Sequence, residues 1–169
     1  SFYKKELFES RAKVFEAGVF APVVAAIGEA LEKYVKAECP VVADGCCDAT
    51  LDVFTPANYA QFGRILKTDG VLIKLAPRAG YLHELREAAG GKLEAYDGAQ
   101  VLDYAHAHVH VLEERKIAYT MPVDGELAVR LAKMTPMLAN VDVDSLDLNG
   151  MKQITIDETM MIGTMKREG

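Results

Sequence analysis

Three cysteines, Cys39, Cys46 and Cys47, lie within nine positions of one another, and their thiols are candidates for metal binding or catalysis. A structural zinc site needs four ligands, and the sequence contains no second cysteine pair to complete one. The adjacent Cys46 and Cys47 do not bridge each other easily. A thiol nucleophile needs a neighbouring base, and the spacing of the residues places none there. We therefore predict reduced thiols in a cytoplasmic protein.

Three histidines alternate along the chain at His106, His108 and His110. On a β-strand their side chains would share one face, which is an arrangement that metal ions use. No cysteine or carboxylate cluster accompanies them in the sequence. We expect packing or solvent-exposed roles for these histidines, and no metal site.

Two polar segments follow short apolar runs that are predicted to be buried strands. Asp44 and Gly45 come after the run 41–43, and the segment 55–58 comes after the run 49–54. Open α/β sheets bind ligands at the carboxyl ends of their strands. Asp44 therefore either orients a ligand or caps a turn. The amide of Asn58 has the same two alternatives, since it can bind a ligand edge or cap the following helix.

The elements that would position these residues alternate between helices and strands. Helices are expected at 5–17, 22–36, 57–66, 81–89, 98–105 and 124–134, with a helical turn at 142–146. Strands are expected at 41–43, 49–54, 71–75, 109–112 (with an extension to 119), 154–156 and 160–165, and a tight turn at 68–70. This alternation predicts an α/β layered fold with a mostly parallel sheet and an antiparallel edge formed by the last two strands. We expect an N-terminal helical entry segment at 1–36 and the main domain at 37–169.

Size and charge limit the classes of function. The chain has 169 residues and a mass of 18.5 kDa, which is the size of one domain. Its net charge of −6 argues against a self-sufficient RNA-binding domain, because such domains usually carry a basic face. No apolar stretch has the length of a membrane span, and the first residues have no signal-peptide pattern. Composition alone thus predicts a protein without a membrane partner.

Five segments, in order, resemble the RlmA-type rRNA (guanine-N1)-methyltransferases. These are Ser10–Pro22, Phe54–Tyr59, Phe62–Gly70, Tyr81–Arg86 and Met134–Pro136. The Leu-Lys-x-Asp-Gly turn within the third segment is common to many methyltransferases, whereas the ordered set is specific. The resemblance covers nearly the whole chain.

The resemblance implies a Rossmann-like class I methyltransferase fold that uses S-adenosyl-L-methionine. Members of this family methylate N1 of one guanine in a hairpin of 23S rRNA near the macrolide site, and some confer antibiotic resistance of the tylosin type. The implied cofactor-binding residues are Phe20, Asp44, Gly45, Cys46, Cys47 and Tyr81. The implied substrate-facing residues are Thr55, Pro56 and Asn58. Phe20 and Tyr81 have ordinary packing as an equal alternative, and no residue stands out as the base that removes the N1 proton.

The chain departs from the family pattern in two places. Family members begin with a zinc-binding module, and this sequence starts after the point where that module would end. The family's glycine-rich cofactor loop, its second strand with a ribose-binding acid, and its third strand are also absent. Only five residues separate Asp44 from Thr50, whereas a connection between parallel strands needs about a dozen. We therefore expect that on the order of fifty residues, about two strand–helix units, are missing between Cys47 and Asp48.

Two other functions fit the sequence. One is a methyltransferase of the same fold that acts on a small molecule. The other is a shortened, non-catalytic remnant that binds a partner through an exposed sheet edge, with self-association as a consequence. A homodimer is a further expectation.

Overall fold

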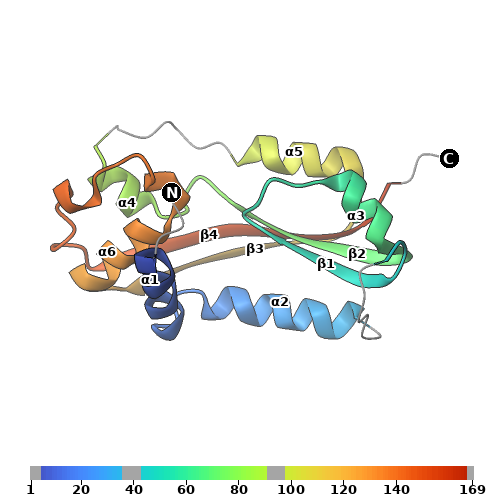
Figure 1. Ribbon diagram of the computed structural model, residues 1–169, viewed down its shortest axis with the longest axis horizontal. Helices are drawn as coiled ribbons and strands as arrows, with labels where there is room; N and C mark the ends of the chain where they lie inside the picture. The colour runs from blue at the N-terminus through green and yellow to red at the C-terminus, as the bar shows by residue number, and fades with distance from the viewer. Residues whose placement is uncertain (1–4, 36–42, 91–97, 167–169) are drawn as a thin grey trace. The chain divides into compact units, whose positions relative to one another are not determined.

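The computed structural model describes residues 5–35, 43–90 and 98–166, and its central feature is a four-stranded sheet with the order β1-β2-β4-β3 (Figure 1). The strands are β1 (Cys47–Val53), β2 (Leu66–Pro77), β3 (Val109–Pro122) and β4 (Gln153–Met165). The helices are α1 (Lys5–Glu16), α2 (Ala21–Tyr34), α3 (Tyr59–Ile65), α4 (His83–Ala88), α5 (Ala99–His108) and α6 (Gly125–Met134), with 3-10 turns at Pro136–Leu138 and Val143–Ser145. The predicted mixed α/β class is confirmed.

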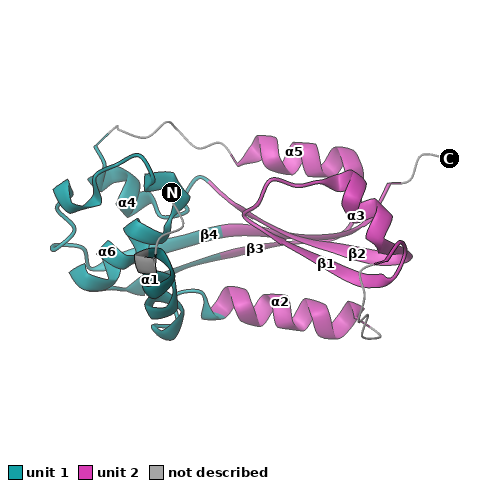
Figure 2. Cartoon of the chain, viewed as in Figure 1, with its two compact units in different colours: residues 1–21, 79–96, 118–157 teal, residues 22–78, 97–117, 158–169 magenta. Residues whose placement is uncertain are grey.

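The chain divides into two compact units, which are coloured separately in Figure 2. Unit 1 comprises residues 1–21, 79–96 and 118–157, and unit 2 comprises residues 22–78, 97–117 and 158–169. Strands β3 and β4 contribute residues to both units. The functional division expected at residue 36 stays a prediction.

Unit 2 contains a β1–α3–β2 segment in which the two strands are parallel. Twelve residues, 54–65, connect these strands, which is the length that a parallel crossover requires. Strand β4 pairs with β2 in the antiparallel direction and lies between β2 and β3. The expectation of an antiparallel edge is therefore wrong in its position, because β4 is an interior strand. The apolar pattern of a strand indicates its burial but not its neighbours.

The expected turn at 68–70 is part of β2. The register passes from Cys47↔Leu66 to Ala49↔Val71, so β2 holds extra residues opposite β1 at this point. Gly70 lies in this irregular stretch, where an added Cβ would be 2.8 Å from the carbonyl oxygen of Cys47. A bulge that glycine permits thus replaces a chain reversal.

Strand β4 joins two strands that the sequence predicted to be separate, at 154–156 and 160–165. The polar residues between them suggested a break, but they continue the strand. Asp157 accepts a hydrogen bond from the backbone N–H of Gly80 at 3.2 Å, which gives this polar side chain a partner inside unit 1.

Most helix predictions are confirmed, and two helix ends have local causes. Gly18 follows α1 with a positive φ of 75°, and Asp124 caps α6 by accepting from the Leu127 N–H at 2.8 Å. Helix α5 extends to His108, so His106 and His108 are helical and do not share a strand face with His110. Of the first predicted strand, residues 41 and 42 lie outside the described residues, and Ala43 is not in a strand.

Helices cover both faces of the sheet in unit 2. Figure 1 shows α3 and α5 on one side and α2 on the other. The core on the α3/α5 side consists of Tyr59, Leu66, Leu72, Ala105, Val109 and Met161. Helix α2 buries Val23, Ala26 and Ala30. Removal of these apolar side chains from water stabilises the layered arrangement.

Unit 1 is built around α1, which packs on α6. Helix α4 is tied to β4 by Glu84, whose carboxylate accepts from the Thr155 N–H at 2.9 Å and from the Thr155 hydroxyl at 2.7 Å. Among the described residues, no single helix is long and apolar enough to cross a membrane. Helices α1 and α2 have the necessary length and hydropathy only when they are counted together as a bent pair.

Candidate functional site

The turn that the sequence offered as the start of a cofactor loop is formed by Asp44 and Gly45, with φ of 61° at Gly45. Arg64, at the end of α3, holds both residues. Its guanidinium forms an ion pair with the Asp44 carboxylate, and its carbonyl oxygen accepts from the Gly45 N–H at 2.8 Å. The two polar groups that would meet a ligand in this turn therefore already have partners within the protein.

Cys46 and Cys47 follow this turn and lead directly into β1. Their sulfur atoms are 3.6 Å apart, which is longer than the bond of about 2.0 Å in a disulfide. The Ala43 N–H donates to the Cys46 sulfur at 3.2 Å. Between Gly45 and β1 the structure has neither a glycine-rich loop nor a helix, so these residues form only the beginning of the expected cofactor segment.

The second candidate segment is the loop 54–58, between β1 and α3. Phe54 has a positive φ of 53°, a conformation that costs energy in a non-glycine residue. The Thr55 hydroxyl donates to Asp52, and Pro56 is exposed. Asn58 caps α3 by accepting from the Gln61 N–H at 3.1 Å, so the capping alternative for Asn58 is realised in the structure.

A buried ion pair that was not predicted from the sequence adjoins this loop. Lys74 Nζ in β2 lies 2.6 Å from Asp52 Oδ2 in β1, and their side chains are 2% and 1% exposed. The two residues are direct partners in the parallel register. The sequence did contain a signal for this pair. Asp52 interrupts the apolar residues of the strand predicted at 49–54, and Lys74 interrupts those of the strand predicted at 71–75.

Further polar groups lie on the same side of the sheet. Tyr59 is buried beneath α5, and its ring stacks on His108 at 4.6 Å. Burial, with a smaller contribution from the negative charge of Asp52, raises the pKa of Tyr59 to about 12. The hydroxyl groups of Thr50, Tyr59 and Thr159 are buried and have no hydrogen-bond partner among the described residues.

The remaining predicted residues, Phe20 and Tyr81, belong to unit 1. Phe20 is 7% exposed, and its ring centroid lies 5.6 Å from that of Phe15. The Tyr81 carbonyl accepts from the Arg86 guanidinium at 2.6 Å, and the following residue, Leu82, has a φ of 49°. These contacts give both aromatic residues packing or structural roles within unit 1, and their roles toward a cofactor stay predictions.

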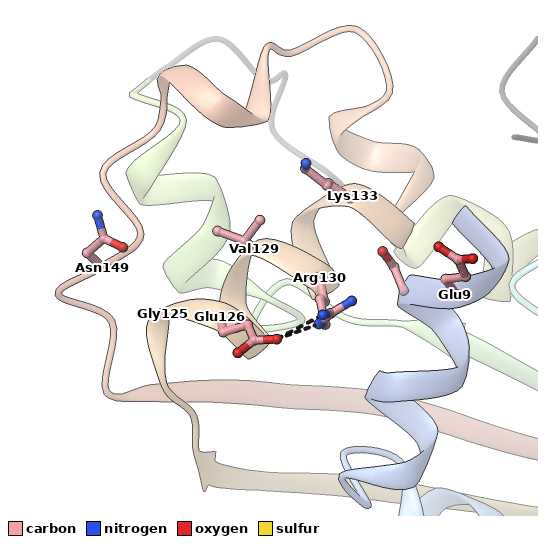
Figure 3. A pocket seen from close by; sticks show the side chains of 8 residues that line it. Glu9, Gly125, Glu126, Val129, Arg130, Lys133 and Asn149 are labelled. Atoms are coloured by element: carbon pink, nitrogen blue, oxygen red, sulfur yellow. Dashed lines mark hydrogen bonds and ion pairs between the residues drawn. The ribbon is translucent and has the colours of Figure 1, made fainter. Parts of the chain in front are cut away.

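Unit 1 also contains a pocket of about 480 Å³ between α1 and α6 that the sequence did not predict (Figure 3). Its lining residues are Glu9, Ser10, Gly125, Glu126, Val129, Arg130, Lys133 and Asn149. Arg130 pairs with Glu126 at 2.8 Å, and Lys133 pairs with Asp144 at 3.2 Å. The basic groups of this pocket thus have acidic partners.

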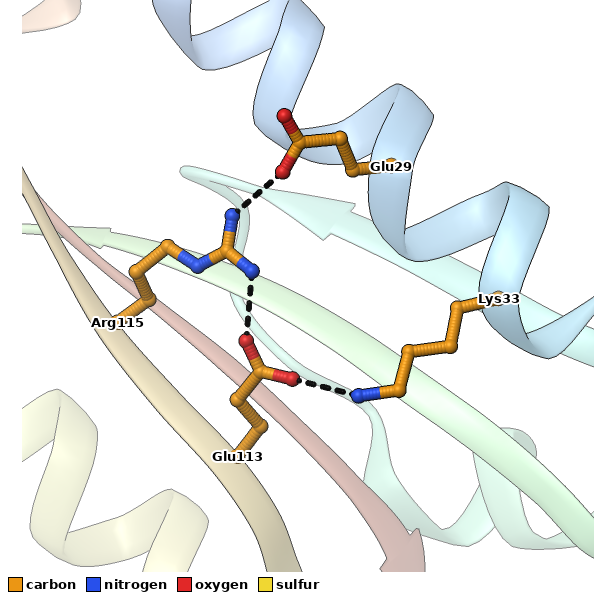
Figure 4. Close-up of polar contacts among 4 residues, drawn as sticks. All are labelled: Glu29, Lys33, Glu113 and Arg115. Atoms are coloured by element: carbon orange, nitrogen blue, oxygen red, sulfur yellow. Dashed lines mark hydrogen bonds and ion pairs between the residues drawn. The ribbon is translucent and has the colours of Figure 1, made fainter.

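An ion-pair network connects α2 to β3 on the opposite side of the sheet from α5 (Figure 4). Arg115 bridges Glu29 and Glu113 at 2.8 Å each, and Lys33 contacts Glu113 at 3.0 Å. The hydrogen bond from Lys33 lowers the pKa of Glu113, and the same contact raises the pKa of Lys33. The network links charges of opposite sign and leaves no basic stripe for nucleic acid at this point.

His106 and His108 have partners within the protein. His106 lies 3.0 Å from Glu114, and the His108 ring nitrogen Nδ1 lies 2.8 Å from the Tyr104 carbonyl oxygen. Within residues 5–35, 43–90 and 98–166, no group of three or more histidine, cysteine, aspartate or glutamate side chains is arranged to hold a metal ion.

No protein-family profile matches the chain. Two curated proteins are similar to it. One is YxjB of Bacillus subtilis (strain 168), which carries the provisional description 23S rRNA (guanine-N(1)-)-methyltransferase and is 34% identical over 121 residues, 69% of this chain and 43% of that protein. The other is the 23S rRNA (guanine(748)-N(1))-methyltransferase of Streptomyces fradiae, 25% identical over 125 residues, 70% of this chain and 45% of that protein. The chain therefore spans less than half the length of either relative. It is related by sequence to the 23S rRNA (guanine-N1)-methyltransferases, as its ordered motifs indicated.

Proposed function

We propose that this chain is part of an S-adenosyl-L-methionine-dependent methyltransferase that modifies N1 of a guanine in a 23S rRNA hairpin. The observation that carries the proposal is the sequence relationship to two curated proteins named for that reaction, over 121 and 125 residues. A methyltransferase acting on a small molecule is the weaker alternative, since both relatives are named for an rRNA substrate. The ribosomal substrate would place the protein in the cytoplasm.

The sheet supports a class I methyltransferase fold in unit 2. The parallel β1–α3–β2 segment brings the carboxyl ends of two strands to one edge of the sheet, which is where open α/β folds bind ligands. The loop 54–58 leaves β1 at this edge. Thr55, Pro56 and Asn58 are its exposed residues, and we assign them to the substrate side of the site.

The described residues do not form a complete site for S-adenosyl-L-methionine. Asp44 and Gly45 are both held by Arg64, and Cys47 enters β1 without an intervening glycine loop. When bound, the cofactor would supply the methyl group. Its ribose and methionine contacts require the strands and the loop that the family resemblance implies next to the outer edge of β1, which pairs with no strand among the described residues.

The decisive experiment uses the whole protein of which this chain is proposed to be part. It measures methyl transfer from labelled S-adenosyl-L-methionine to a 23S rRNA hairpin, and to the same hairpin with adenine in place of the target guanine. We expect transfer to the guanine hairpin alone. Binding should weaken steeply as salt rises, because the phosphate contacts of an RNA-binding protein release counterions. A small-molecule enzyme would show cofactor binding without this salt dependence. A non-catalytic remnant would bind neither cofactor nor hairpin and would self-associate.

A further inference from the structure

We propose that the buried Lys74–Asp52 pair, extended by the Thr55 hydroxyl, is a positioning device that fixes the loop 54–58 in the conformation that receives the target guanine. The inference rests on the proposed function. It assigns a role to Lys74 and Asp52, which lie outside the motifs, and it concerns how the site is held in place.

The geometry of the three residues forms a continuous chain. Lys74 Nζ donates to Asp52 Oδ2 at 2.6 Å, and the Thr55 hydroxyl donates to the other carboxylate oxygen, Oδ1. Both oxygens of Asp52 therefore have a donor. The Phe54 N–H also donates to the Leu75 carbonyl at 3.3 Å, so β2 holds the start of the loop through both a side chain and the backbone.

Burial makes this arrangement costly to maintain. The charged groups of Lys74 and Asp52 are almost fully removed from water, and desolvation of two ions offsets much of their mutual attraction. A well-packed apolar pair would stabilise the sheet as well or better. The ion pair does something that an apolar pair cannot do, because only a carboxylate gives Thr55 an acceptor beneath the loop.

The loop conformation requires such an anchor. Phe54 has a φ of 53°, which is strained for a residue with a side chain, and it is 40% exposed, so packing around its ring does not compensate fully. Strained residues persist when surrounding contacts determine them, and they cluster at functional sites. Asp52 fixes Thr55 directly after Phe54, and Asn58 fixes the other end of the loop by capping α3.

The consequence is a loop held at both ends by side-chain hydrogen bonds within the protein. Thr55 lies on the substrate side of the site, and its hydroxyl tethers the loop to Asp52. The parts of the loop left for the guanine are its backbone and its exposed surface around Pro56. A target base would thus meet a preformed surface, which lowers the cost of binding.

The test compares three variants of the whole methyltransferase of which this chain is proposed to be part. Thr55→Val removes the hydroxyl and keeps the shape, and Thr55→Ser restores it. Thr50→Val is the matched control, because Thr50 lies two residues before Asp52 on β1 and its buried hydroxyl has no partner among the described residues. Hydrogen exchange of the amides at 54–58 reports the loop itself. The ratio of the affinities for the guanine hairpin and for the same hairpin with adenine measures how well the site recognises guanine. The kcat and KM of methyl transfer separate an effect on positioning from an effect on binding.

We expect Thr55→Val to speed exchange at 54–58 and to reduce the preference for the guanine hairpin by about tenfold, the size of one lost hydrogen bond to a charged group. Thr55→Ser should restore both readouts, and Thr50→Val should change neither. Unchanged exchange at 54–58 in Thr55→Val overturns the positioning role alone. Faster exchange with unaltered guanine preference and unaltered kinetics also overturns it, since the contact would then be merely structural. A whole wild-type protein that neither binds nor methylates the hairpin overturns the proposed function and the positioning role with it.

Discussion

At the level of single side chains, burial changes how much an ion pair contributes to the stability of this protein. Lys74 and Asp52 form an ion pair with side chains 2% and 1% exposed, whereas Lys13 and Glu16 form one with side chains 59% and 64% exposed. Each pair joins one lysine to one carboxylate. Their contributions to stability differ because a buried ion that loses its partner cannot recover its hydration, whereas an exposed ion can.

Lys74→Met should therefore lower the free energy of unfolding by about 3–5 kcal/mol, since it leaves the Asp52 carboxylate buried without its cation. The double variant Asp52→Leu with Lys74→Met should cost much less than the sum of the two single changes, because it removes both charges together. Urea denaturation followed by circular dichroism measures these values. Lys13→Met is the matched control, with an expected change of about 0–1 kcal/mol. Additive single changes at Asp52 and Lys74 would contradict the coupling.

Helices and strands in this protein are stabilised by two kinds of contact, and only one kind can be predicted from the sequence. Asp124 and Asn58 cap α6 and α3 through side-chain oxygens, and both residue types signal a helix start in the sequence. The close approach of β2 to β1 at Gly70 has no such local signal, because its cause is a carbonyl on another strand.

Gly70→Ala should destabilise the sheet. The new Cβ would lie 2.8 Å from the Cys47 carbonyl and 3.0 Å from the Lys67 nitrogen, so a backbone shift would be required. Gly28→Ala in α2 is the matched control, because nothing lies within 4 Å of its added Cβ. It should raise stability by about 1 kcal/mol through helix propensity. Thermal unfolding of the two variants gives opposite shifts in Tm, and a higher Tm for Gly70→Ala would contradict the observed register.

The network between α2 and β3 should make stability depend on pH at both extremes. The pKa of Glu113 is lowered from 4.5, so its contribution is present above 4.5 and is lost as the pH falls through the folded value. The pKa of Lys33 is raised from 10.5, so its contribution is present below 10.5 and is lost as the pH rises through the folded value.

Glu113→Gln removes the carboxylate that Lys33 and Arg115 share. Its difference in unfolding free energy from the wild type should be largest between these two pH limits and should shrink beyond each of them. Denaturation in urea across the pH range measures the difference, with added salt as a second check on exposed charges. A difference that is constant with pH would show that Glu113 contributes by packing alone.

At the scale of the whole molecule, the question is whether the chain contains everything its proposed activity needs. The relatives are more than twice as long as the matched segments, and the turn at Asp44 leads into β1 without a cofactor loop. The parallel pair β1 and β2 fits half of an open α/β sheet, with the outer edge of β1 available for further strands.

The intact mass of the purified protein tests this point, together with titration of S-adenosyl-L-methionine by calorimetry. A mass near 18.5 kDa with no cofactor binding is the expected outcome for the 169 residues alone. A mass several kilodaltons higher, accompanied by cofactor binding, would show that the protein contains further residues that contribute to the cofactor site. Cofactor binding by a protein of 18.5 kDa would contradict the incompleteness inferred from the turn at Asp44.

The sequence by itself determined the alternation of helices and strands, the cap at Asp124 and the similarity to rRNA methyltransferases, because these depend on local periodicity, residue type and ordered motifs. It left the amide of Asn58 with two alternatives, a cap or a ligand contact. The tertiary structure alone decided that β4 lies inside the sheet, that residues 68–70 form a bulge instead of a turn, and that Arg64 closes the turn at Asp44. It also paired Lys74 with Asp52 across 22 positions of sequence. Contacts between distant segments depend on strand order and register, which the side-chain pattern of a single strand does not specify.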